Sequence, residues 1–462
     1  MSPDGPGSPA VAYLVSQYPA LSHAFIEREI LALRAAGVGV TTFTVRRCPP
    51  EDLMSPVMVE EDRRTTALLG AARSAYLGAG LGQVAAGGVA SLGAGLVAAV
   101  RAGRGGVRPR IWQAFYLVEA LRLVTEMRAR GLRHVHVHFA NNGADIARLA
   151  VALGNGSRGQ RQDAGPRWTW SFSMHGPTEF ETPQAHGLAA KTRAAAFVAC
   201  ISRYAVRQLA PHLPETDRAK LAIVHMGVDP DRFPGSADVR TGRSPGPLRV
   251  LFVGRLVQEK GPDVLLRALA RLTVPFRARI VGAGPLGHHL RTLAEQLGIT
   301  DRVEFPGGLG QGALPGLYAW ADVFCLPSHR EGVPVVLMEA MATELPVVTT
   351  SIAGIPELVT DRVSGRLLAP GDPSAVATVL DELARDASQR RSLGRAGRQV
   401  VLGSFTPGPN ARVLAGLLAS VQSSDAGQRP KLTPPQGPDG GDPHRTASTD
   451  AGFRAHRTGR QP

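Results

Sequence analysis

Two cations flank a short loop in the segment VGRLVQEKG, where the sequence predicts that a strand ends and a helix follows. Arg255 carries a planar guanidinium fork and Lys260 a compact ammonium, so together they suit a diphosphate. Only four of the 52 basic residues are Lys, which makes Lys260 a selective use of that residue. The alternative is that both are ordinary surface cations.

Two carboxylates, Glu331 and Glu339, are separated by seven positions in PSHREGVPVVLMEAMATELP. Glu339 lies in a strongly apolar helix predicted to begin near Pro334, so its carboxylate should be partly buried and needs hydrogen-bond donors. Hydroxyl groups of a ligand would supply them. The alternatives are an exposed helix face for Glu339 and a helix N-terminal dipole partner for Glu331.

The segment GAGPLG at 282–287 has the G-x-G-x-x-G spacing of a dinucleotide-binding turn, and Glu304 follows where such folds place a ribose-binding carboxylate. This pattern makes a nicotinamide-dependent oxidoreductase an alternative function. The motif lies in the second strand-helix unit of its half, which favours a glycine-rich turn that lets backbone approach a phosphate or a facing domain.

Three histidines alternate in HVHVHF: His134, His136 and His138. A strand would place all three on one face, like a set of metal ligands. No carboxylate or cysteine cluster accompanies them in the sequence, so we favour a strand that ends at a cleft and expect no metal site.

The elements that position these residues form two successive α/β patterns. Residues 11–15 and 38–45 are predicted strands around a helix beginning at Ser22, and a second series of strands and helices restarts at Leu248. Such patterns predict two doubly wound domains that face each other across a cleft at the carboxyl ends of their strands.

We predict six segments from composition and pattern. They are a flexible N-terminus at 1–10, an N-terminal acceptor-binding domain at 11–235, a helical Ala/Gly-rich and basic insertion within it at about 67–130, a linker at 236–247, a C-terminal nucleotide-sugar domain at 248–423 and a disordered tail at 424–462.

The net charge of +14 is concentrated in the region 101–133, which holds eight Arg against two Glu. Ile111, Phe115 and Val118 recur there at helical spacing, which indicates a basic amphipathic helix beside anionic lipid or, equally, a solvated helix face. The preceding segment 74–100 has no charge but is rich in Gly and Ala. It favours a packed insertion, with a surface helical pair and a transmembrane span as alternatives.

Three scattered cysteines, Cys48, Cys200 and Cys325, form no disulfide framework and no CxxC motif. The opening MSPDGPGSPA shows no secretory leader pattern. We therefore expect a cytoplasmic location, at the inner face of the plasma membrane if the basic helix binds lipid. Aromatic residues are only 5% of the chain, so nucleic acid is not an expected partner.

The motifs from about Leu248 to Leu383 resemble those of the retaining GT-B glycosyltransferases of family 4. They are VGRLVQEKG, VGAGPLG, PSHREG, the E-x7-E pair and GIPELVTDRVSGRLLAPGDP. The resemblance implies that Arg255 and Lys260 hold the donor diphosphate, that Glu331 contacts the transferred sugar and that Glu339 binds the nucleotide ribose. It also implies that Gly254, Gly282 and Gly284 allow close backbone approach in the donor site, which includes Gly332 as well.

The first half is similar to family members that build exopolysaccharide or lipid-linked oligosaccharide, through SQYPALSHAFIEREILAL, HVHFANNGADIA, WSFSMHGPTEF and ISRYAVRQL. The resemblance implies that His175 faces the reacting sugar and is catalytic together with Arg255, Lys260 and Glu331. Ser16, Ser22 and His138 are the implied acceptor contacts. The sequence departs from the family pattern here, because no Gly-Gly pair follows the first strand and SHAF replaces the commoner SETF.

The activity implied by the resemblance is retaining transfer of a hexosyl group from a UDP- or GDP-sugar to a hydroxyl of a glycan or polyprenyl-linked or other lipid-linked acceptor. Exopolysaccharide or cell-envelope glycan synthesis is the implied process. No cofactor is expected, because placed cations can stabilise the departing diphosphate without a metal. A catalytically inactive nucleotide-sugar-binding relative and the oxidoreductase remain as alternatives.

Overall fold

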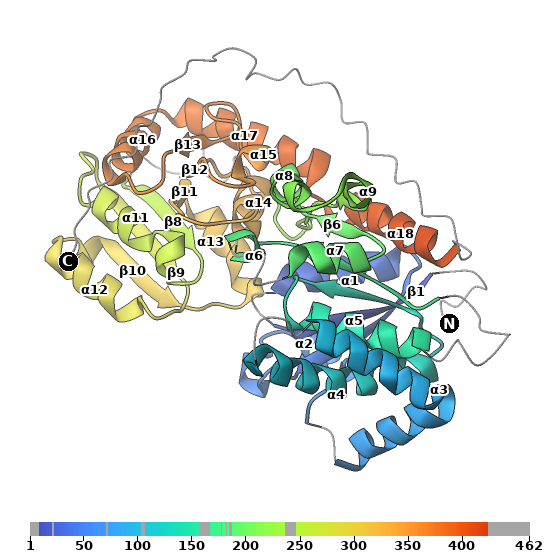
Figure 1. The fold of residues 1–462 in the computed structure, drawn as a ribbon. Coiled ribbons are helices and arrows are strands. Elements are labelled where there is room, and N and C mark those ends of the chain that lie inside the picture. Colours follow the sequence, from blue (N-terminus) through green and yellow to red (C-terminus); the bar gives the residue numbers. More distant parts are fainter. Residues whose placement is uncertain are drawn as a thin grey trace, which may run out of the picture. The chain divides into compact units, whose positions relative to one another are not determined.

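The computed structural model describes residues 9–20, 23–70, 73–102, 107–156, 167–176, 178–181, 183, 187–235 and 246–423. The predicted acceptor contact Ser22, most of the predicted N-terminus and linker, and the whole predicted tail lie outside the described residues. Figure 1 shows the fold of the described residues.

A sheet of seven parallel strands occupies the first half, in the order β3-β2-β1-β4-β5-β6-β7. Parallel strands covered on both faces are apolar throughout, as the buried run VAYLV in β1 shows. The strands are β1 (Ala10–Gln17), β2 (Gly39–Arg46), β3 (Thr66–Ala67), β4 (His134–His138), β5 (Thr169–Met174), β6 (Val198–Cys200) and β7 (Leu221–Ile223).

The helices of this half connect its parallel strands. Alternate side chains of β1 enter two different cores: Ala12 and Leu14 pack with α4 and α5, while Val11 and Tyr13 pack with α1. The helices are α1 (Ala24–Ala35), α2 (Pro56–Arg64), α3 (Arg73–Ala102), α4 (Val107–Ala129), α5 (Asn142–Gly156), α6 (Thr178–Glu181), α7 (Leu188–Ala194), α8 (Arg203–Leu209) and α9 (Glu215–Arg218).

A second sheet of six parallel strands follows, in the order β10-β9-β8-β11-β12-β13. Its strands are β8 (Leu248–Val253), β9 (Phe276–Val281), β10 (Val303–Gly307), β11 (Val323–Leu326), β12 (Val347–Thr350) and β13 (Arg366–Leu368). Its helices are α11 (Pro262–Leu269), α12 (Gly287–Gln296), α13 (Leu314–Trp320), α14 (Val335–Ala342), α15 (Ile355–Leu358), α16 (Pro373–Arg385) and α17 (Ala387–Ser404). The predicted starts of the helices near Pro262, Gly287 and Pro334 are confirmed to within one residue.

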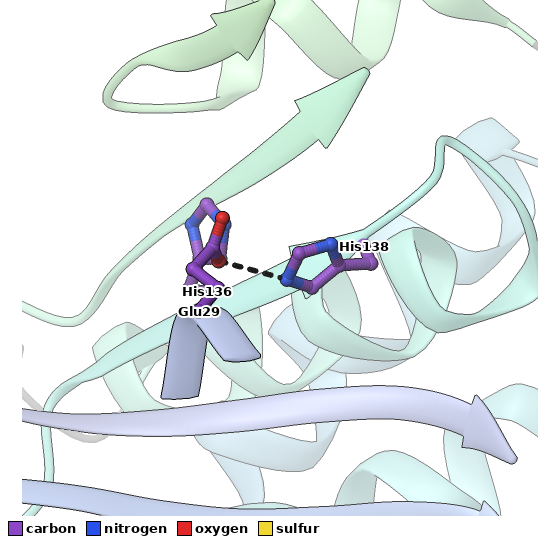
Figure 2. Close-up of side chains that lie close together, drawn as sticks. All are labelled: Glu29, His136 and His138. Atoms are coloured by element: carbon purple, nitrogen blue, oxygen red, sulfur yellow. Dashed lines mark ion pairs between the residues drawn. The ribbon is translucent and has the colours of Figure 1, made fainter. Parts of the chain in front are cut away.

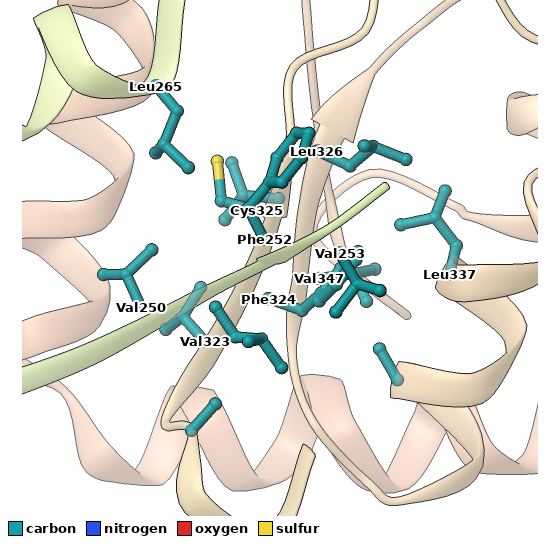
Figure 3. Packing of buried hydrophobic residues seen from close by; sticks show 14 of the residues in the cluster. Val250, Phe252, Val253, Leu265, Val323, Phe324, Cys325, Leu326, Leu337 and Val347 are labelled. Carbon is teal, nitrogen blue, oxygen red and sulfur yellow. The ribbon is translucent and has the colours of Figure 1, made fainter. Parts of the chain in front are cut away.

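The core of the second sheet is apolar and tightly interleaved (Figure 3). Side chains of the central strands β8 and β11 meet those of α11 and α14, with Phe252, Leu265 and Leu337 fully buried. All three cysteines are buried and free. Burial raises the pKa of the Cys200 thiol to about 12, so this thiol is protonated and unreactive at neutral pH.

The last described helix, α18 (Pro407–Ser423), lies within the range predicted for the C-terminal domain, 248–423, but packs with the N-terminal half. Its residues Ala411, Leu414 and Leu418 are buried in one cluster with Ile26 and Ile30 of α1. Figure 1 shows α18 beside α1 and β1. Because α18 buries its apolar face against the first sheet, it belongs to the packing of the N-terminal half, which a sequence pattern without contacts does not reveal.

The predicted insertion at about 67–130 is helical, but it is not a separate addition to the sheet. The second half of α4 buries Leu123, Val124 and Met127 in the core under β1 and β4, so α4 is part of the layer that covers the sheet. Among the described residues, no single helix is long and apolar enough to cross a membrane. Only the bent pair Ser74–Ala85 and Gly88–Ala102 meets that criterion when its two parts are taken together.

Candidate active site

Two loops at the carboxyl ends of β8 and β11 are held against each other. The backbone amides of His329 and Arg330 both donate to the carbonyl oxygen of Glu259, at 2.8 and 3.2 Å. Gly261 has a φ of 65°, and a Cβ at this position would lie 2.2 Å from a carbonyl oxygen of the second loop. Only glycine permits this approach, which brings the ends of the two loops together.

Lys260 and Glu331 meet at this junction and form a two-point ion pair. The Lys260 ammonium donates to Oε1 and Oε2 of Glu331 at 2.6 and 2.8 Å, and the Ser328 hydroxyl donates to Oε1 at 2.9 Å. Glu331 is buried, whereas Lys260 is partly open to solvent. Arg255 is exposed and makes no ion pair with the described residues, so its guanidinium is free to bind an anion.

The glycines of GAGPLG serve the packing of the protein itself. Gly282 and Gly284 have φ values of 148° and 159°, and a Cβ on them would lie 1.8 Å from the Gly254 carbonyl oxygen and 2.5 Å from that of Leu256. The turn after β9 therefore closes on the loop after β8. A Cβ on Gly254 would make only ordinary contacts, the nearest at 3.6 Å, so the protein does not itself demand glycine there.

Glu304, the ribose-binding candidate of the oxidoreductase alternative, has a structural partner instead. It pairs with Arg279 of the neighbouring strand β9 at 2.8 Å, and the Arg279 guanidinium lies 4.1 Å from the ring centre of Trp320. These are the contacts of an exposed strand edge. The structure gives the oxidoreductase no support.

Glu339 is almost fully buried, as predicted, but the protein supplies its hydrogen-bond donors. Arg28 from α1 donates to Oε1 at 2.7 Å, and the Tyr318 hydroxyl donates to Oε2 at 2.9 Å. Arg28 also donates to Gln311 at 2.9 Å, while its Nε and Nη1 are buried without a hydrogen-bond partner among the described residues. A ribose contact at Glu339 would therefore require the carboxylate to exchange a protein donor for a hydroxyl.

The histidines of β4 face a row of hydroxyls on β5, because the two strands pair in register. His134 contacts Thr169 and Ser171 at 2.8 Å each, and His136 contacts Ser171 and Ser173 at 2.8 and 3.0 Å. Burial lowers the pKa of His134 to about 3, so its ring is neutral. Both nitrogens of these two rings are occupied by hydroxyl groups.

The row ends in His138, which lies beside the carboxylate of Glu29 (Figure 2) and is linked to a further histidine, His175. His138 Nε2 lies 3.1 Å from Oε1 of Glu29, which also accepts the Tyr13 hydroxyl at 2.7 Å. His138 Nδ1 lies 2.8 Å from Nε2 of His175. Burial lowers the pKa of His138 to about 3 and that of His175 well below its ordinary value, so both rings are neutral.

The position of the Glu29 carboxylate determines the tautomers of the His138 and His175 rings. The angle at His138 Nε2 falls short of a good hydrogen bond, but a lone pair this close to a carboxylate oxygen would be repelled, so Nε2 carries the proton. His138 Nδ1 then accepts a hydrogen bond from Nε2–H of His175. His175 Nδ1 is left as a bare acceptor, buried and without a partner among the described residues.

The His175 ring is held by aromatic neighbours and adjoins the loop of Glu331. The ring centres of Phe25 and Phe139 lie 4.9 and 4.8 Å from that of His175. A Cβ on Gly332 would lie 2.3 Å from the His175 carbonyl oxygen, so this glycine permits the loop after β11 to touch the end of β5. The structure thus brings the predicted residues His175, Glu331 and Gly332 together.

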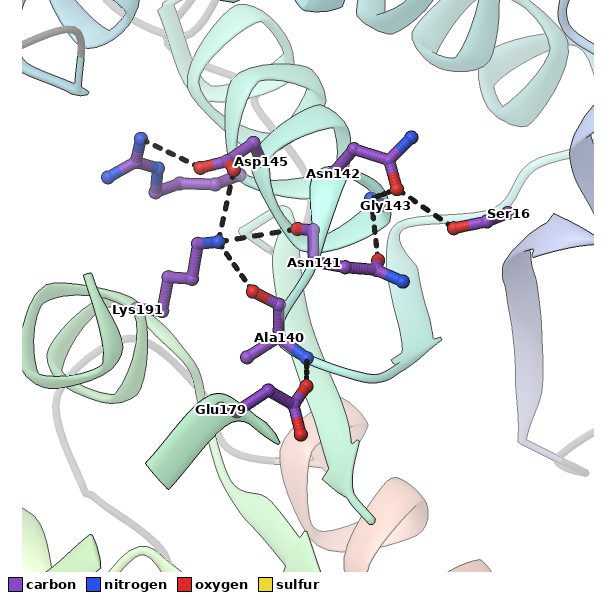
Figure 4. Close-up of polar contacts among 9 residues, drawn as sticks. Ser16, Ala140, Asn141, Asn142, Gly143, Asp145, Glu179 and Lys191 are labelled. Carbon is purple, nitrogen blue, oxygen red and sulfur yellow. Dashed lines mark hydrogen bonds and ion pairs between the residues drawn. The ribbon is translucent and has the colours of Figure 1, made fainter. Parts of the chain in front are cut away.

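A second polar network fixes the loops after β4 and β5 relative to each other (Figure 4). Buried Lys191 donates to the Ala140 carbonyl at 2.7 Å and pairs with Asp145 at 3.0 Å. Glu179 accepts from the amides of Ala140 and Gly176 at 2.6 and 3.3 Å. Desolvation lowers the pKa of Lys191 and raises that of Glu179, and their hydrogen bonds offset the cost of burial.

Ser16, a predicted acceptor contact, belongs to this network. Its hydroxyl donates to Oδ1 of Asn142 at 2.9 Å, and the same oxygen accepts from the Gly143 amide at 3.0 Å (Figure 4). Ser16 therefore ties the end of β1 to the first turn of α5.

One group of potential metal ligands is present among the described residues, formed by Glu29, His136 and His138. Their ligand atoms lie within 4.8 Å of one another. Our premise that no carboxylate accompanies these histidines was wrong, because Glu29 comes from α1, more than 100 positions away. Both nitrogens of His136 are already hydrogen-bonded, however, so a cation would have to displace the hydroxyl groups of β5.

Comparison with known proteins identifies the C-terminal half. Residues 237–400 match the family model described as Glycosyl transferases group 1. A relative from Salmonella typhimurium named as a colanic acid biosynthesis glycosyltransferase, WcaL, is 40% identical over 213 residues, covering 44% of this chain and 52% of that protein.

Residues 237–400 therefore resemble a group 1 glycosyltransferase domain.

Two further comparisons concern a mycobacterial enzyme and the fold of the whole chain. The GDP-mannose-dependent alpha-(1-6)-phosphatidylinositol monomannoside mannosyltransferase of Mycolicibacterium smegmatis is 35% identical over 216 residues, covering 43% of this chain and 56% of that protein. The structure of Anabaena HepE in complex with UDP-glucose matches with a TM-score of 0.66 at 16% identity, covering 89% of this chain and all of that one. This chain spans about half the length of the curated relatives it matches. The predicted GT-B fold and the resemblance to glycosyltransferases of the colanic-acid type are confirmed.

The glycosyltransferase domain contains the predicted donor residues, but sequence reasoning missed the partners that reach them from elsewhere. Arg28 and Glu29 lie in the segment SQYPALSHAFIEREILAL. Glu179 is the second-last residue of the segment WSFSMHGPTEF. Lys191 is one of only four lysines, the same signal that drew attention to Lys260. The segments and the rare lysine were recognisable in the sequence, but no sequence pattern showed which residues these side chains contact.

Proposed function

We propose that this protein is a retaining glycosyltransferase that moves a hexosyl group from a UDP- or GDP-sugar to a hydroxyl of a glycan or lipid-linked acceptor. The observation that supports it best is the junction of the Lys260–Glu331 ion pair with the end of β5, where Gly332 touches His175. A diphosphate, a sugar hydroxyl and an acceptor each have a fitting group there.

The cations of the glycosyltransferase domain match the charge that develops in this reaction. The bond from the anomeric carbon to the departing phosphate oxygen breaks, and negative charge accumulates on the diphosphate. Lys260 can exchange one carboxylate contact for a phosphate oxygen, and the exposed Arg255 can add a forked contact. Glu331, once released, accepts hydrogen bonds from sugar hydroxyls.

The acceptor oxygen bonds to the anomeric carbon from the face that the diphosphate leaves. Its proton passes to the departing phosphate oxygen, so atoms and charge balance without an enzymic nucleophile. The bare Nδ1 of His175 accepts a hydrogen bond from a hydroxyl at the reacting sugar. We expect this chemistry to proceed without a metal, so transfer should persist in excess chelator.

The names of the relatives indicate the process. The WcaL relative is named for colanic acid biosynthesis and the mycobacterial relative for GDP-mannose-dependent transfer to a phosphatidylinositol mannoside. We accordingly propose a role in exopolysaccharide or cell-envelope glycan synthesis, with a cytoplasmic location at the inner face of the plasma membrane. A polyprenyl-linked glycan is the proposed acceptor.

The proposal is tested with a panel of UDP- and GDP-sugars, measuring released nucleoside diphosphate in the presence of a lipid-linked acceptor fraction. Release that depends on the acceptor supports transfer. Nucleotide-sugar binding without release would identify an inactive relative. A thermal shift with NAD or NADP but with neither UDP nor GDP would favour an oxidoreductase.

Two substitutions separate the roles of the ion pair. Lys260→Ala should lower kcat/KM by about 30- to 1000-fold, on the order of 2–4 kcal/mol, because it removes a charge-assisted contact to the diphosphate. Glu331→Ala should reduce transfer far more than UDP or GDP binding. Lys220→Ala, which removes a lysine paired with Asp217 elsewhere, is the matched control. Unchanged kcat/KM in Lys260→Ala, or equal losses of transfer and nucleotide binding in Glu331→Ala, would contradict the assignment.

A further inference from the structure

Large apolar side chains are exposed on α3 and the first half of α4. Of nineteen exposed large apolar residues among the described part of the chain, twelve lie between residues 77 and 118. They include Ile111, Trp112, Phe115 and Val118 on α4. Scattered exposed apolar residues are ordinary, but a concentration of this kind marks an interaction surface.

This exposure does not reflect helices that lack packing. α3, α4 and α5 pack side by side (Figure 1), and the inner face of α3 is closely fitted to α5. A Cβ on Gly95 would lie 2.6 Å from the Leu153 side chain, and Ser91 donates to the Leu153 carbonyl at 2.6 Å. The apolar outer face is therefore additional to what the fold requires.

The charged residues of the segment that forms this face have one sign. Residues 63–118 contain seven Arg and no Asp or Glu, and Arg101, Arg108 and Arg110 are exposed. The rings of Trp112 and Tyr116 stack with their centres 6.1 Å apart. Aromatic rings with arginines beside exposed aliphatic side chains are the composition of a helix that lies in a membrane interface.

The apolar stripe of α4 ends at a basic pocket. Ile111, Phe115, Val118 and Arg122 follow at spacings of four, three and four residues, which places them on one face of the helix. Arg122 lines a pocket together with three further arginines, Arg46, Arg47 and Arg63. Arg46 and Arg63 make no ion pair with the described residues, which leaves two cations to receive a phosphate.

We propose that the face formed by the exposed apolar residues of 77–118 docks on the surface of an anionic bilayer, with a lipid phosphate bound by Arg46 and Arg63 in the pocket that Arg47 and Arg122 also line. The apolar side chains enter the headgroup region, and the arginines pair with lipid phosphates. A second copy of the chain fits poorly, because it would oppose one set of arginines with another. The proposed surface, residues 77–118, begins nearer the N-terminus than the predicted basic segment 101–133 and overlaps only its first part. Beyond residue 121 the arginines of that segment are engaged within the protein, as in the pairs of Arg122 and Arg130 with Glu126.

The test is co-sedimentation of the full chain with vesicles of phosphatidylcholine alone or mixed with phosphatidylglycerol, without any sugar substrate. We expect binding to the mixed vesicles that weakens as salt is raised. Ile111→Ser with Phe115→Ser, and separately Arg46→Glu with Arg63→Glu, should each lower partitioning by about tenfold or more. Trp112 should be quenched by brominated lipid.

Matched controls keep the number and kind of changes but place them elsewhere. Leu402→Ser with Val413→Ser removes two other exposed apolar side chains, and Arg267→Glu with Arg271→Glu reverses two other exposed arginines. Both should bind vesicles like the unaltered protein. Equal losses in control and test variants, or no binding by the unaltered protein, would overturn the proposal. So would a dimer that Ile111→Ser with Phe115→Ser dissociates while vesicles stay unbound. Since no catalysis is measured, these outcomes are independent of the proposed transfer activity.

Discussion

His175 owes its chemical character to the residues behind its ring. Its ring is neutral because burial disfavours the charged form, and its proton lies on Nε2 because His138 and Glu29 form a chain of acceptors behind it. A lone histidine would distribute its proton over both nitrogens. Glu29 is thus a positioning residue. It keeps Nδ1 of His175 unprotonated, so that this nitrogen can accept a hydrogen bond from a hydroxyl group.

This assignment predicts different outcomes for two substitutions of Glu29. Glu29→Leu removes the acceptor, so the tautomers of His138 and His175 should mix and kcat should fall on the order of tenfold or more. Glu29→Gln keeps an oxygen that can accept from both His138 and Tyr13, so it should retain most of the activity. KM for the nucleotide sugar should change little in either variant.

Nitrogen chemical shifts of selectively labelled histidine provide a readout that a merely structural role would not move. His175 Nδ1 should appear unprotonated in the unaltered protein and in Glu29→Gln, and partly protonated in Glu29→Leu. A proton on Nδ1 of His175 in the unaltered protein would refute the assigned tautomers. Thermal unfolding of the variants separates this effect from loss of fold.

Helix α4 combines two environments along one element. Its first half exposes an apolar face, whereas its second half lies in the core, and Glu119 falls at the change between them. Burial raises the pKa of the Glu119 carboxyl to about 7, against an ordinary value of 4.5. The folded state therefore binds this proton more tightly than the unfolded chain does.

The stability of the folded protein therefore depends on pH through Glu119 of this helix. The contribution of Glu119 is fully present below about pH 4.5 and is lost as the pH rises through about 7. Glu119→Gln should remove this fall and raise the unfolding temperature at pH 8. Glu295→Gln on the exposed face of α12 is the control, and should leave the pH profile unchanged. If both variants follow the unaltered profile, the carboxyl of Glu119 titrates normally.

The sequence predicted the elements more completely than their partners. Both sheets, the starts of three helices and the loop cations follow from local patterns, because strands and helices are encoded within short windows. The donors to Glu339, the carboxylate behind His138 and the packing of α18 were not predictable. Each joins residues far apart in the chain, and a pattern of residue types does not specify which distant group lies opposite.

One buried ion pair joins the two halves of the described part of the molecule. Arg28 of α1 and Glu339 of α14 are both buried, and Arg28 reaches no other carboxylate among the described residues. Arg28→Ala should lower the free energy of unfolding by about 3–5 kcal/mol, because it leaves a charge buried without its partner. The double change Arg28→Met with Glu339→Leu should cost much less, since neither charge remains.

Urea unfolding followed by circular dichroism measures both variants. Equal destabilisation by the single and the double change would show that packing volume, not the charge pair, is the important contribution. The comparison needs no substrate, so it holds whichever nucleotide sugar the protein uses.

The return of α18 to the first sheet sets an order of events during synthesis. The face of that sheet carrying Val11, Tyr13 and Phe197 shares its core with residues of α18, the last described helix to leave the ribosome. The N-terminal half must therefore wait, with part of its core open, while the whole glycosyltransferase domain is made and folded. A fragment ending at residue 235 would carry that opening permanently and should aggregate, whereas one that regains residues 407–423 as a separate peptide should stay in solution.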